Sequence, residues 1–521
     1  MEKFIILIPL FPLITASCLG GLHLFGVIEG EKSERFTARV ANYAVGLSCL
    51  IALLLLGQDC WFGNKAVLTL GNWLHVDDLV IQISFFTNGF SLKLVVLFAL
   101  LLCVVMRFSV NYLHREAGFH RFFFVLSLFS FAMFMLVLSA NALGTFIGWE
   151  IAGLCSYLLI GYLYNSQHAT QNATRVFITN RIGDAGFIAG IVLCYLWLGN
   201  IKNWLDIPVF IHQLSAQKLN LIALCFVIAA MVKSAQLPFT PWLARAMEGP
   251  TPSSAIFYGA IMIHSGVYLL FLIRPLLELT PLIAGFVAII GLLTAFYAYI
   301  VGLTQTDIKT SLIFATTGQL GLLFLECGLG FWELAAWHLF AHIIVRAYQL
   351  LTAPSLLHNI NSTYIQNSPV FLANNRRLYT YATQRFWLEP MTDWLIVKPV
   401  MNLASDLNYV DKQIIDPLMG SPAPTIHAIS SLAQAQERNI GAHLDNTEDT
   451  FAQGSGLAGK LTQWSANVLH WFEHHFILQG VSENMFHYGR RLGHIANQTE
   501  LALLKPRYLV TFIFITLLVA M

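Results

Sequence analysis

Long apolar runs alternate with short polar connections over the first 357 residues of the chain. Most runs hold roughly 20 residues, the number that a helix needs to cross the hydrocarbon core of a bilayer. The pattern predicts eleven spans, near residues 4–28, 38–57, 86–110, 122–138, 141–163, 173–198, 219–247, 252–273, 281–302, 309–328 and 331–357. A final apolar run, Tyr508–Met521, is short but is predicted as a twelfth span.

The hydrophobic pattern also divides the chain. It predicts a transmembrane domain over 1–357, a polar region over 358–505 and a C-terminal transmembrane helix over 506–521. Within the polar region, Phe386–Leu407 and Leu461–Arg491 have amphipathic patterns with tryptophans, which suit a membrane interface. We therefore expect this region to offer a docking surface for a partner.

Composition supports a polytopic, all-α membrane protein that is embedded in the lipid bilayer. Hydrophobic residues make up 57% of the chain and charged residues 11%, against about 25% charged residues in soluble domains. A net charge of +1 and the absence of a basic run argue against nucleic-acid binding. None of the eight cysteines lies in a CxxC pair, so they are interpreted as reduced hydrophobic residues, and no cofactor is predicted in this chain.

The distribution of basic residues predicts the orientation. Loops 29–39 and 107–121 each hold three lysines or arginines, whereas 58–82 holds one lysine and three aspartates. Basic loops face the cytoplasm. The prediction therefore puts 358–505 in the cytoplasm and both termini in the periplasm of a bacterial inner membrane. The apolar N-terminus is too long for a signal peptide and is interpreted as the first span.

The seventh span contains a lysine followed by prolines, in the run MVKSAQLPFTPW. Lys233 is expected near the middle of an apolar helix, and Pro238 and Pro241 should break that helix just after it. A break at membrane depth is tolerated only where it is buried in protein or lines a wet cavity. A desolvated lysine can release and regain a proton. This arrangement suits a proton switch.

Three further charged residues lie inside the fifth and sixth spans. Glu150 is expected to titrate or to find a partner, although a helix–helix hydrogen bond would also explain it. Arg181 and Asp184 lie three residues apart and so share a helix face. They form either a local structural ion pair or a pair that exchanges partners with Glu150 or Lys233.

Polar residues also gather in the eighth and tenth spans. Asp307 follows Thr306 at an expected helix start, so it is interpreted first as an N-cap, with Lys309 close behind it. Tyr258 and His264 add polar groups to the eighth span, which is more polar than a helix that faces lipid. All four are candidates for an ion pathway.

The eleventh span carries His338, His342 and Arg346, spaced four residues apart and so on one face of the helix. The histidine spacing could bind a metal, but no third ligand is evident, and a hydrated proton relay fits better. Arg346 is effectively always charged, so it can orient water or a carboxylate but cannot pass a proton.

Four runs, GWEIAGLCSYLLIGYLY, TNRIGDAG, KSAQLPFTPWLARAMEGPTPSSA and QTDIKTSLIFATTGQLG, resemble the antiporter-like subunits of respiratory complex I and the Mrp-type antiporters, above all the chain 5 or L-type subunit. The resemblance covers roughly residues 60–357. It implies that Glu150 and Lys233 form the central pair of a proton half-channel. It also implies two inverted five-helix repeats, each with a broken helix.

The chain departs from this family in its second half. SSAIFYG, with Tyr258, stands where the family has a histidine, and Arg346 stands where it has a lysine. The later spans with the second broken helix are absent, while YVDKQIIDPLM still resembles the family tail. The expected fold is therefore an antiporter-like fold with one complete repeat and an incomplete second one. Such truncated chains resemble the membrane subunit of two-component inorganic-carbon accumulation systems, called DAB or Mps.

Three functional hypotheses follow. In the first, the chain conducts ions, with H⁺ preferred, for a cytoplasmic partner that resembles carbonic anhydrase and carries the zinc. In the second, it is a chain 5-like subunit of NADH-quinone oxidoreductase or a Mrp-type antiporter subunit. In the third, it only anchors a soluble enzyme. Retention of Glu150, Arg181, Asp184 and Lys233 argues against the third, since each charge costs about 2.5–3.5 kcal/mol on insertion scales.

Overall fold

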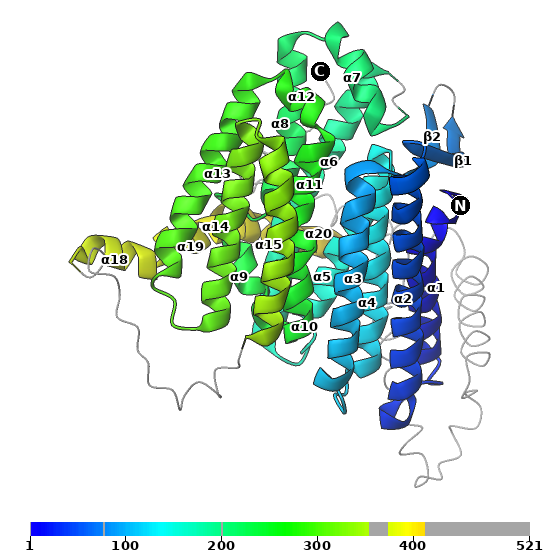
Figure 1. The fold of residues 1–521 in the computed structure, drawn as a ribbon. Coiled ribbons are helices and arrows are strands. Elements are labelled where there is room, and N and C mark those ends of the chain that lie inside the picture. Colours follow the sequence, from blue (N-terminus) through cyan, green and yellow to red (C-terminus); the bar gives the residue numbers. More distant parts are fainter. Residues whose placement is uncertain (1, 77–78, 200–201, 354–373, 412–521) are drawn as a thin grey trace, which may run out of the picture. The chain divides into compact units, whose positions relative to one another are not determined.

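The computed structural model describes residues 2–76, 79–199, 202–353 and 374–411 (Figure 1). Eleven helices in this part of the chain are long and apolar enough to cross a membrane, which confirms the number of spans predicted before residue 358. The proposed twelfth span, 506–521, and the amphipathic stretch Leu461–Arg491 lie outside the described residues.

The candidate spans follow the chain in order. They are η1 with α1 (Glu2–Leu24), α2 (Gly30–Phe62), α3 (Gly89–Tyr112), α4 (Phe119–Leu138), α5 (Ala142–Ile160), α6 (Gln167–Leu198), α8 (Ala216–Lys233), α10 to α11 (Thr251–Leu272), α13 (Pro281–Gly302), α14 (Ile308–Gly328) and α15 (Trp332–Thr352). Short helices connect them, namely η2 (Trp204–Asp206), α7 (Ile207–Phe210), η3 (Ile211–Gln213), α9 (Pro241–Arg245), η4 (Ala246–Glu248) and α12 (Arg274–Glu278). Contacts divide the chain into two units, Met1–Val400 and Met401–Met521, and the contacts and distances given below lie within the first.

Small residues bring neighbouring helices into close contact. The antiparallel helices α13 and α14 pack along each other (Figure 1), and Gly291 and Gly321 lie at their crossing. A Cβ on Gly291 would lie 2.5 Å from the Gly321 carbonyl oxygen, and one on Gly321 would lie 2.6 Å from that of Gly291. Such small residues drive helix association in membranes because lipid provides no hydrophobic force between helices.

One element was not predicted. The segment 58–82, expected as a loop, contains most of an antiparallel hairpin of β1 (Val67–Val76) and β2 (Leu79–Phe86). The hairpin reaches the start of α5, where the Asn141 amide donates to the Gln82 carbonyl oxygen at 2.5 Å. The Asn141 side chain also caps α5 by accepting from the Gly144 amide at 2.6 Å.

The break in the seventh span follows Lys233 directly, as predicted, but the lysine does not lie near the middle of its helix. It is the last residue of α8. The Ser234 backbone already leaves the helical conformation, Pro241 starts α9 and a cis peptide bond joins Leu237 to Pro238. The helix therefore ends at the lysine itself rather than at the prolines that follow.

Polar contacts satisfy backbone groups at this break. The Trp242 indole N–H donates to the Val232 carbonyl oxygen at 2.8 Å, and the Leu237 amide donates to the Thr294 hydroxyl at 3.0 Å. These bonds meet the requirement that irregular backbone at membrane depth be paired within the protein.

The eighth span is also irregular. It runs through α10 (Thr251–Ser254), the π-helical turn η5 (Ala255–Ala260), the 3₁₀ turn η6 (Met262–His264) and α11 (Ser265–Leu272). Changes of helical type within one span are frequent at functional sites. Here the change places His264 at the junction of η6 and α11.

After α15, the described chain resumes with short helices: α18 (Arg376–Thr383), η7 (Arg385–Trp387), α19 (Leu388–Thr392), η8 (Asp393–Val397) and α20 (Lys398–Val410). Residues Arg385–Val397, here called the strap, pack on the bundle. Phe386 and Leu388 join Tyr297 in an apolar cluster that also includes Leu237 from the helix break. Part of the predicted amphipathic stretch Phe386–Leu407 therefore contacts the transmembrane domain.

Ion pairs fix the strap. Glu389 pairs with Arg245 of α9, and Asp393 lies 3.2 Å from Arg175 of α6. Arg385 donates to the Gln305 amide oxygen at 3.2 Å. Burial lowers the pKa of the Arg385 guanidinium group below its usual range. The strap thus connects two elements that belong to the candidate site, α6 and the segment that follows α8.

Candidate functional site

Lys233 is buried, with 1% of the residue exposed. Its ammonium donates to the Trp149 carbonyl oxygen at 3.1 Å and lies 4.9 Å from the centroid of the Trp149 ring. Within the described residues, no carboxylate lies close enough to form an ion pair with it. The lysine therefore has neutral partners, although carboxylates lie nearby in the same region.

Those carboxylates form a cluster around Arg181. One guanidinium nitrogen lies 2.5 Å from Glu150 of α5, and another lies 3.0 Å from Asp184, one turn further along α6. The local pair of Arg181 and Asp184 expected from their spacing is present, and Glu150 is bound to the same arginine. The indole N–H of Trp149 donates to the second oxygen of Asp184 at 2.8 Å. Trp149 thereby connects this cluster to Lys233.

The cluster is buried unevenly. Asp184 is 3% exposed, but the side chains of Glu150 and Arg181 keep 26% and 38% of their surface exposed. Both residues lie inside helices that are long enough to span the membrane. Charges that face lipid are costly, so this edge of the bundle is suited to contact water or another protein.

A second polar group links the eighth and eleventh spans. The Nε2 atom of His264 lies 2.8 Å from Nδ1 of His342, and the Arg346 Nε–H donates to His342 Nε2 at 3.4 Å. Because arginine only donates, His342 Nε2 accepts and its Nδ1 carries the proton toward His264. These three of the predicted residues lie together in one buried hydrogen-bonded row.

His338 belongs to a neighbouring network. Its Nδ1 lies 2.9 Å from Glu326 and its Nε2 lies 2.8 Å from the Gln319 amide oxygen, both on α14. Its ring centroid lies 6.1 Å from that of His342. The two histidines are neighbours, as their spacing predicted, but each forms its hydrogen bonds with different partners.

Asp307 and Lys309 lie apart from both groups, at the start of α14. Asp307 caps the helix by accepting from the Thr310 amide at 2.8 Å, as predicted. Lys309 donates to the Thr251 hydroxyl at 2.8 Å, and Tyr112 lies 3.0 Å from the same hydroxyl. The predicted residue Tyr258 lies in η5, but its side chain is outside the described part of the structure.

One backbone contact joins the lysine to the histidine row. Ser234, which follows Lys233, donates from its hydroxyl to the carbonyl oxygen of Ile263, which precedes His264. The bond measures 2.7 Å and is buried. This bond attaches the helix break directly to the irregular eighth span. A movement of one segment should therefore displace the other.

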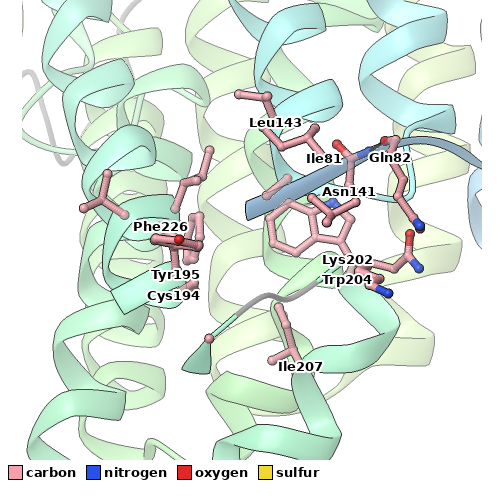
Figure 2. A pocket seen from close by; sticks show the side chains of 16 residues that line it. Ile81, Gln82, Asn141, Leu143, Cys194, Tyr195, Lys202, Trp204, Ile207 and Phe226 are labelled. Atoms are coloured by element: carbon pink, nitrogen blue, oxygen red, sulfur yellow. Dashed lines mark hydrogen bonds between the residues drawn. The ribbon is translucent and has the colours of Figure 1, made fainter. Parts of the chain in front are cut away.

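A cavity of about 270 Å³ lies beside the start of α5. Figure 2 shows Cys194, Tyr195 and Phe226 on one side of it and Gln82 and Lys202 on the other. Its walls are mainly apolar, and none of the predicted pathway residues lines it. The cavity is therefore separate from the charged cluster.

Sequence reasoning missed one residue of these networks, Trp149, and singled out Gln319 and Glu326 without assigning them a role. Gln319 and Glu326 were visible as polar residues within a span and lie seven apart on α14, close to one face. Trp149 gave no such signal, because a tryptophan in an apolar helix is normally interpreted as a hydrophobic core residue. Only its contacts with Lys233 and Asp184 reveal it.

The chain is therefore a multi-pass membrane protein with charged and titratable side chains at the break of its seventh span. Its sequence matches two family descriptions: "NADH:quinone oxidoreductase/Mrp antiporter, TM" over residues 139–385, and "NADH-Ubiquinone oxidoreductase (complex I), chain 5 N-terminus" over residues 73–123. Together they span more than half of the chain. It belongs to the family of antiporter-like membrane subunits found in complex I and Mrp antiporters.

Individual relatives agree with this family. The chain is 34% identical over 367 residues to the chloroplastic NAD(P)H-quinone oxidoreductase subunit 5 of Zygnema circumcarinatum, covering 69% of this chain and 52% of the relative. It is 36% identical over 332 residues to NADH-quinone oxidoreductase subunit L of Campylobacter jejuni, covering 64% and 54%. The chain thus spans about half the length of the curated relatives it matches.

Solved structures support the fold. A chain in the Mrp complex from Dietzia sp. superposes with a TM-score of 0.56 at 24% identity, covering 65% of this chain and 37% of that one. A chain of the archaeal membrane-bound sulfane sulfur reductase superposes with a TM-score of 0.58 at 18% identity, covering 67% and 70%. The antiporter-like fold predicted from the sequence is confirmed.

Proposed function

We propose that this chain moves a cation, with H⁺ preferred, across a membrane by way of Lys233. One observation supports this above all: a buried ammonium with neutral partners ends a broken helix beside the Glu150–Arg181–Asp184 cluster. An ammonium held by a carbonyl oxygen and a ring face can change partners without first breaking a buried ion pair, which is costly. Loss and gain of its proton would follow that change of partners.

The histidine row would carry the proton onward. His264 and His342 share one hydrogen bond, and imidazole is the side chain best suited to exchange protons near neutral pH. Arg346 would hold the orientation of His342 without exchanging a proton itself. The bond from Ser234 to Ile263 attaches this row to the lysine, so movement at the break would reach both groups.

We further propose that the chain is the membrane subunit of a two-component inorganic-carbon accumulation complex in a bacterial inner membrane. Cation flow would drive hydration of carbon dioxide to bicarbonate in a cytoplasmic partner that resembles carbonic anhydrase. Two observations support this. Arg346 stands where the resembled family has lysine, and among the described residues after Thr352 no helix is both long and apolar enough to cross a membrane.

The zinc of such a complex would belong to the partner. Among the residues that the structure describes, no three His, Cys, Asp or Glu side chains lie together as a metal site would require. We propose that the partner docks on the 358–505 region, which lies on the cytoplasmic side in the orientation predicted from basic residues. The strap would transmit that docking to the helix break, since Glu389 pairs with Arg245.

A second function is favoured by a different observation. The partly exposed ion pair of Glu150 and Arg181 would be covered if another membrane subunit packed against this face. That is the arrangement expected of a subunit of NADH-quinone oxidoreductase or of a Mrp-type antiporter. The relative in Campylobacter is named as a subunit of NADH-quinone oxidoreductase, and the relative in Zygnema as a subunit of an NAD(P)H-quinone oxidoreductase.

Co-expression separates these functions. Together with the zinc-bearing protein of a neighbouring gene, this chain should let a strain without carbonic anhydrase grow in air, and an uncoupler should stop carbon uptake. The chain with Lys233→Arg is the matched control and should not support growth. Growth with this chain alone, or uptake that persists without an ion gradient, would contradict the two-component function. A neighbouring set of complex I or Mrp genes would favour the second function.

A further inference from the structure

Trp149 is the residue that touches both halves of the candidate site. It lies on α5 directly before Glu150 and is 1% exposed. Its carbonyl oxygen accepts from the Lys233 ammonium, and the face of its ring lies 4.9 Å from that nitrogen. Its indole N–H donates to Asp184 at 2.8 Å. Backbone, ring face and ring nitrogen of one residue are thus all engaged with charged groups.

The contacts with Lys233 hold its ammonium away from the carboxylates. A carbonyl oxygen and an aromatic face both attract a cation, and neither can accept its proton. The ammonium is therefore held by two neutral groups, the carbonyl oxygen and the ring face of Trp149, and both stabilise its charged form. Exchange with the cluster requires the ammonium to leave Trp149.

The contact with Asp184 orders the cluster. The indole N–H occupies Oδ1 of the carboxylate, while Oδ2 faces Arg181 at 3.0 Å. Hydrogen bonds to charged acceptors are among the strong ones. With both oxygens engaged, Asp184 is held on Arg181 and is not free to turn toward Lys233.

Gly153 leaves space between the two halves. It lies one turn after Trp149 on α5, and a Cβ at this position would lie 3.4 Å from the Lys233 nitrogen and 3.6 Å from an Arg181 nitrogen. Because glycine has no side chain, the gap between these two cations stays open. The gap is the direct route by which the ammonium could shift toward the cluster.

We propose that Trp149 is a positioning residue for cation transfer: it holds Lys233 apart from the carboxylates and Asp184 on Arg181, while Gly153 keeps the route between them open. This inference rests on the proposed cation transport through Lys233. In the resting state of the site, Trp149 holds both Lys233 and Asp184 in place. Transfer is predicted to begin when the Lys233 ammonium leaves Trp149.

Trp204 is a matched control for a purely structural role. It is also buried, at 4% exposure, and packs near the same Phe187 ring as Trp149. Its indole N–H donates to the neutral Thr145 hydroxyl at 3.1 Å. Trp204→Phe therefore removes a tryptophan of similar burial and packing without touching a charged group.

The experiment measures cation flux into proteoliposomes that contain the full-length chain. Trp149→Phe keeps a ring beside Lys233 but removes the donor to Asp184, and we expect flux to fall about tenfold because that bond is to a charged group. Trp204→Phe should leave flux within about twofold of wild type, since its bond joins neutral groups. Gly153→Ala should also reduce flux, whereas Gly46→Ala, which meets no atom within 4 Å, should not.

A double-mutant cycle tests the stated cause. If Trp149 acts through Asp184, then Trp149→Phe should have no further effect in an Asp184→Asn background. Additive losses, or equal losses in the two tryptophan variants, would overturn the inference. So would wild-type flux in Trp149→Phe while Lys233→Ala is inactive, a result that leaves the proposed transport intact. Absence of flux through the wild-type chain overturns both.

Discussion

The Nε2 atom of His264 lies 2.8 Å from Nδ1 of His342, which joins the end of η6 to the middle of α15. One of these nitrogens donates and the other accepts, so the pair cannot keep this bond with both rings fully protonated. The two histidines are 78 positions apart in the chain, and the sequence gave no sign of this pairing. A proton that reaches either ring has a direct path to the other.

The first prediction concerns this pair. His264→Phe or His342→Phe keeps an aromatic ring of similar size but interrupts the path, and we expect cation flux in proteoliposomes to fall by roughly a hundredfold, as for loss of a positioned proton donor. His212→Phe, on the exposed turn η3, is the control and should be neutral. Normal flux in either buried variant would remove the histidine row from the pathway.

The second prediction concerns the lysine. Lys233→Arg and Lys233→Ala should both abolish flux while the protein still inserts in the membrane. Arginine keeps the charge but does not cycle its proton near neutral pH, so this variant separates charge from proton exchange. Glu150→Gln should also lose flux, because it keeps the shape of the side chain and loses the charge that faces Arg181 at 2.5 Å.

Lys218→Arg provides the contrast for this prediction. Lys218 lies in the first turn of α8, is exposed and faces the ring of Trp197 at 5.2 Å, so the substitution should leave flux close to that of wild type. If Lys233→Arg were as active as wild type, a cycle of proton loss and gain at this position would be excluded.

The sequence alone predicts the eleven spans because long apolar runs give a strong signal that needs no tertiary information. It also predicts the helix break, since Pro238 and Pro241 cannot continue a helix. It does not place Lys233 at the last residue of α8. The end of α8 at Lys233 depends on tertiary hydrogen bonds. The Trp242 indole donates to the Val232 carbonyl oxygen, and the Ser234 hydroxyl donates to the Ile263 carbonyl oxygen in the eighth span.

Partners of the site residues were less predictable. The pair of Arg181 and Asp184 follows from helical spacing, but the bond between Arg181 and Glu150 joins two helices. The β1–β2 hairpin was missed because its glycine and polar residues resemble a loop, and its bonds are formed between two strands. Long-range pairing, rather than local preference, accounts for these differences.

The third prediction concerns packing beside the lysine. A Cβ on Gly266 of α11 would lie against the Ala230 carbonyl oxygen and the Ser234 hydroxyl, closer than real Cβ contacts permit. Gly266→Ala should therefore push α11 away from α8 and cost about 1–3 kcal/mol, as overpacking of a core does. Thermal unfolding in detergent measures the loss. Gly285→Ala, with open space on α13, should unfold like wild type.

The fourth prediction concerns metal. We expect the purified chain, separated from any partner, to contain no stoichiometric zinc, flavin or iron. His338 already directs both ring nitrogens to oxygens of α14, and His342 bonds His264, so neither ring is free to turn to a metal. Metal analysis by mass spectrometry checks this. One zinc per chain, lost in His338→Phe with His342→Phe, would contradict the relay assignment.

The fifth prediction concerns the strap. Arg245 and Glu389 form a partly buried ion pair, with 30% and 19% of their side chains exposed. Reversing one charge, as in Glu389→Arg, should detach the strap at a cost of about 1–3 kcal/mol, between the values for exposed and buried pairs. Arg245→Glu combined with Glu389→Arg should restore it. Cysteines introduced at Ala244 and Leu388, which pack in one cluster, report attachment by crosslinking.

The same variants test whether the strap acts on the helix break. Arg245 lies on α9, which follows the helix break after Lys233. Detachment of the strap should therefore let α9 and the break move, and with them the position of Lys233. Flux should therefore change in each single reversal and recover in the double variant. Arg274→Glu, which removes an exposed pair with Glu278 elsewhere in the bundle, should change neither crosslinking nor flux. Crosslinking that is lost while flux stays normal would show that the strap only covers the bundle, and that a docked partner must reach the lysine by another element.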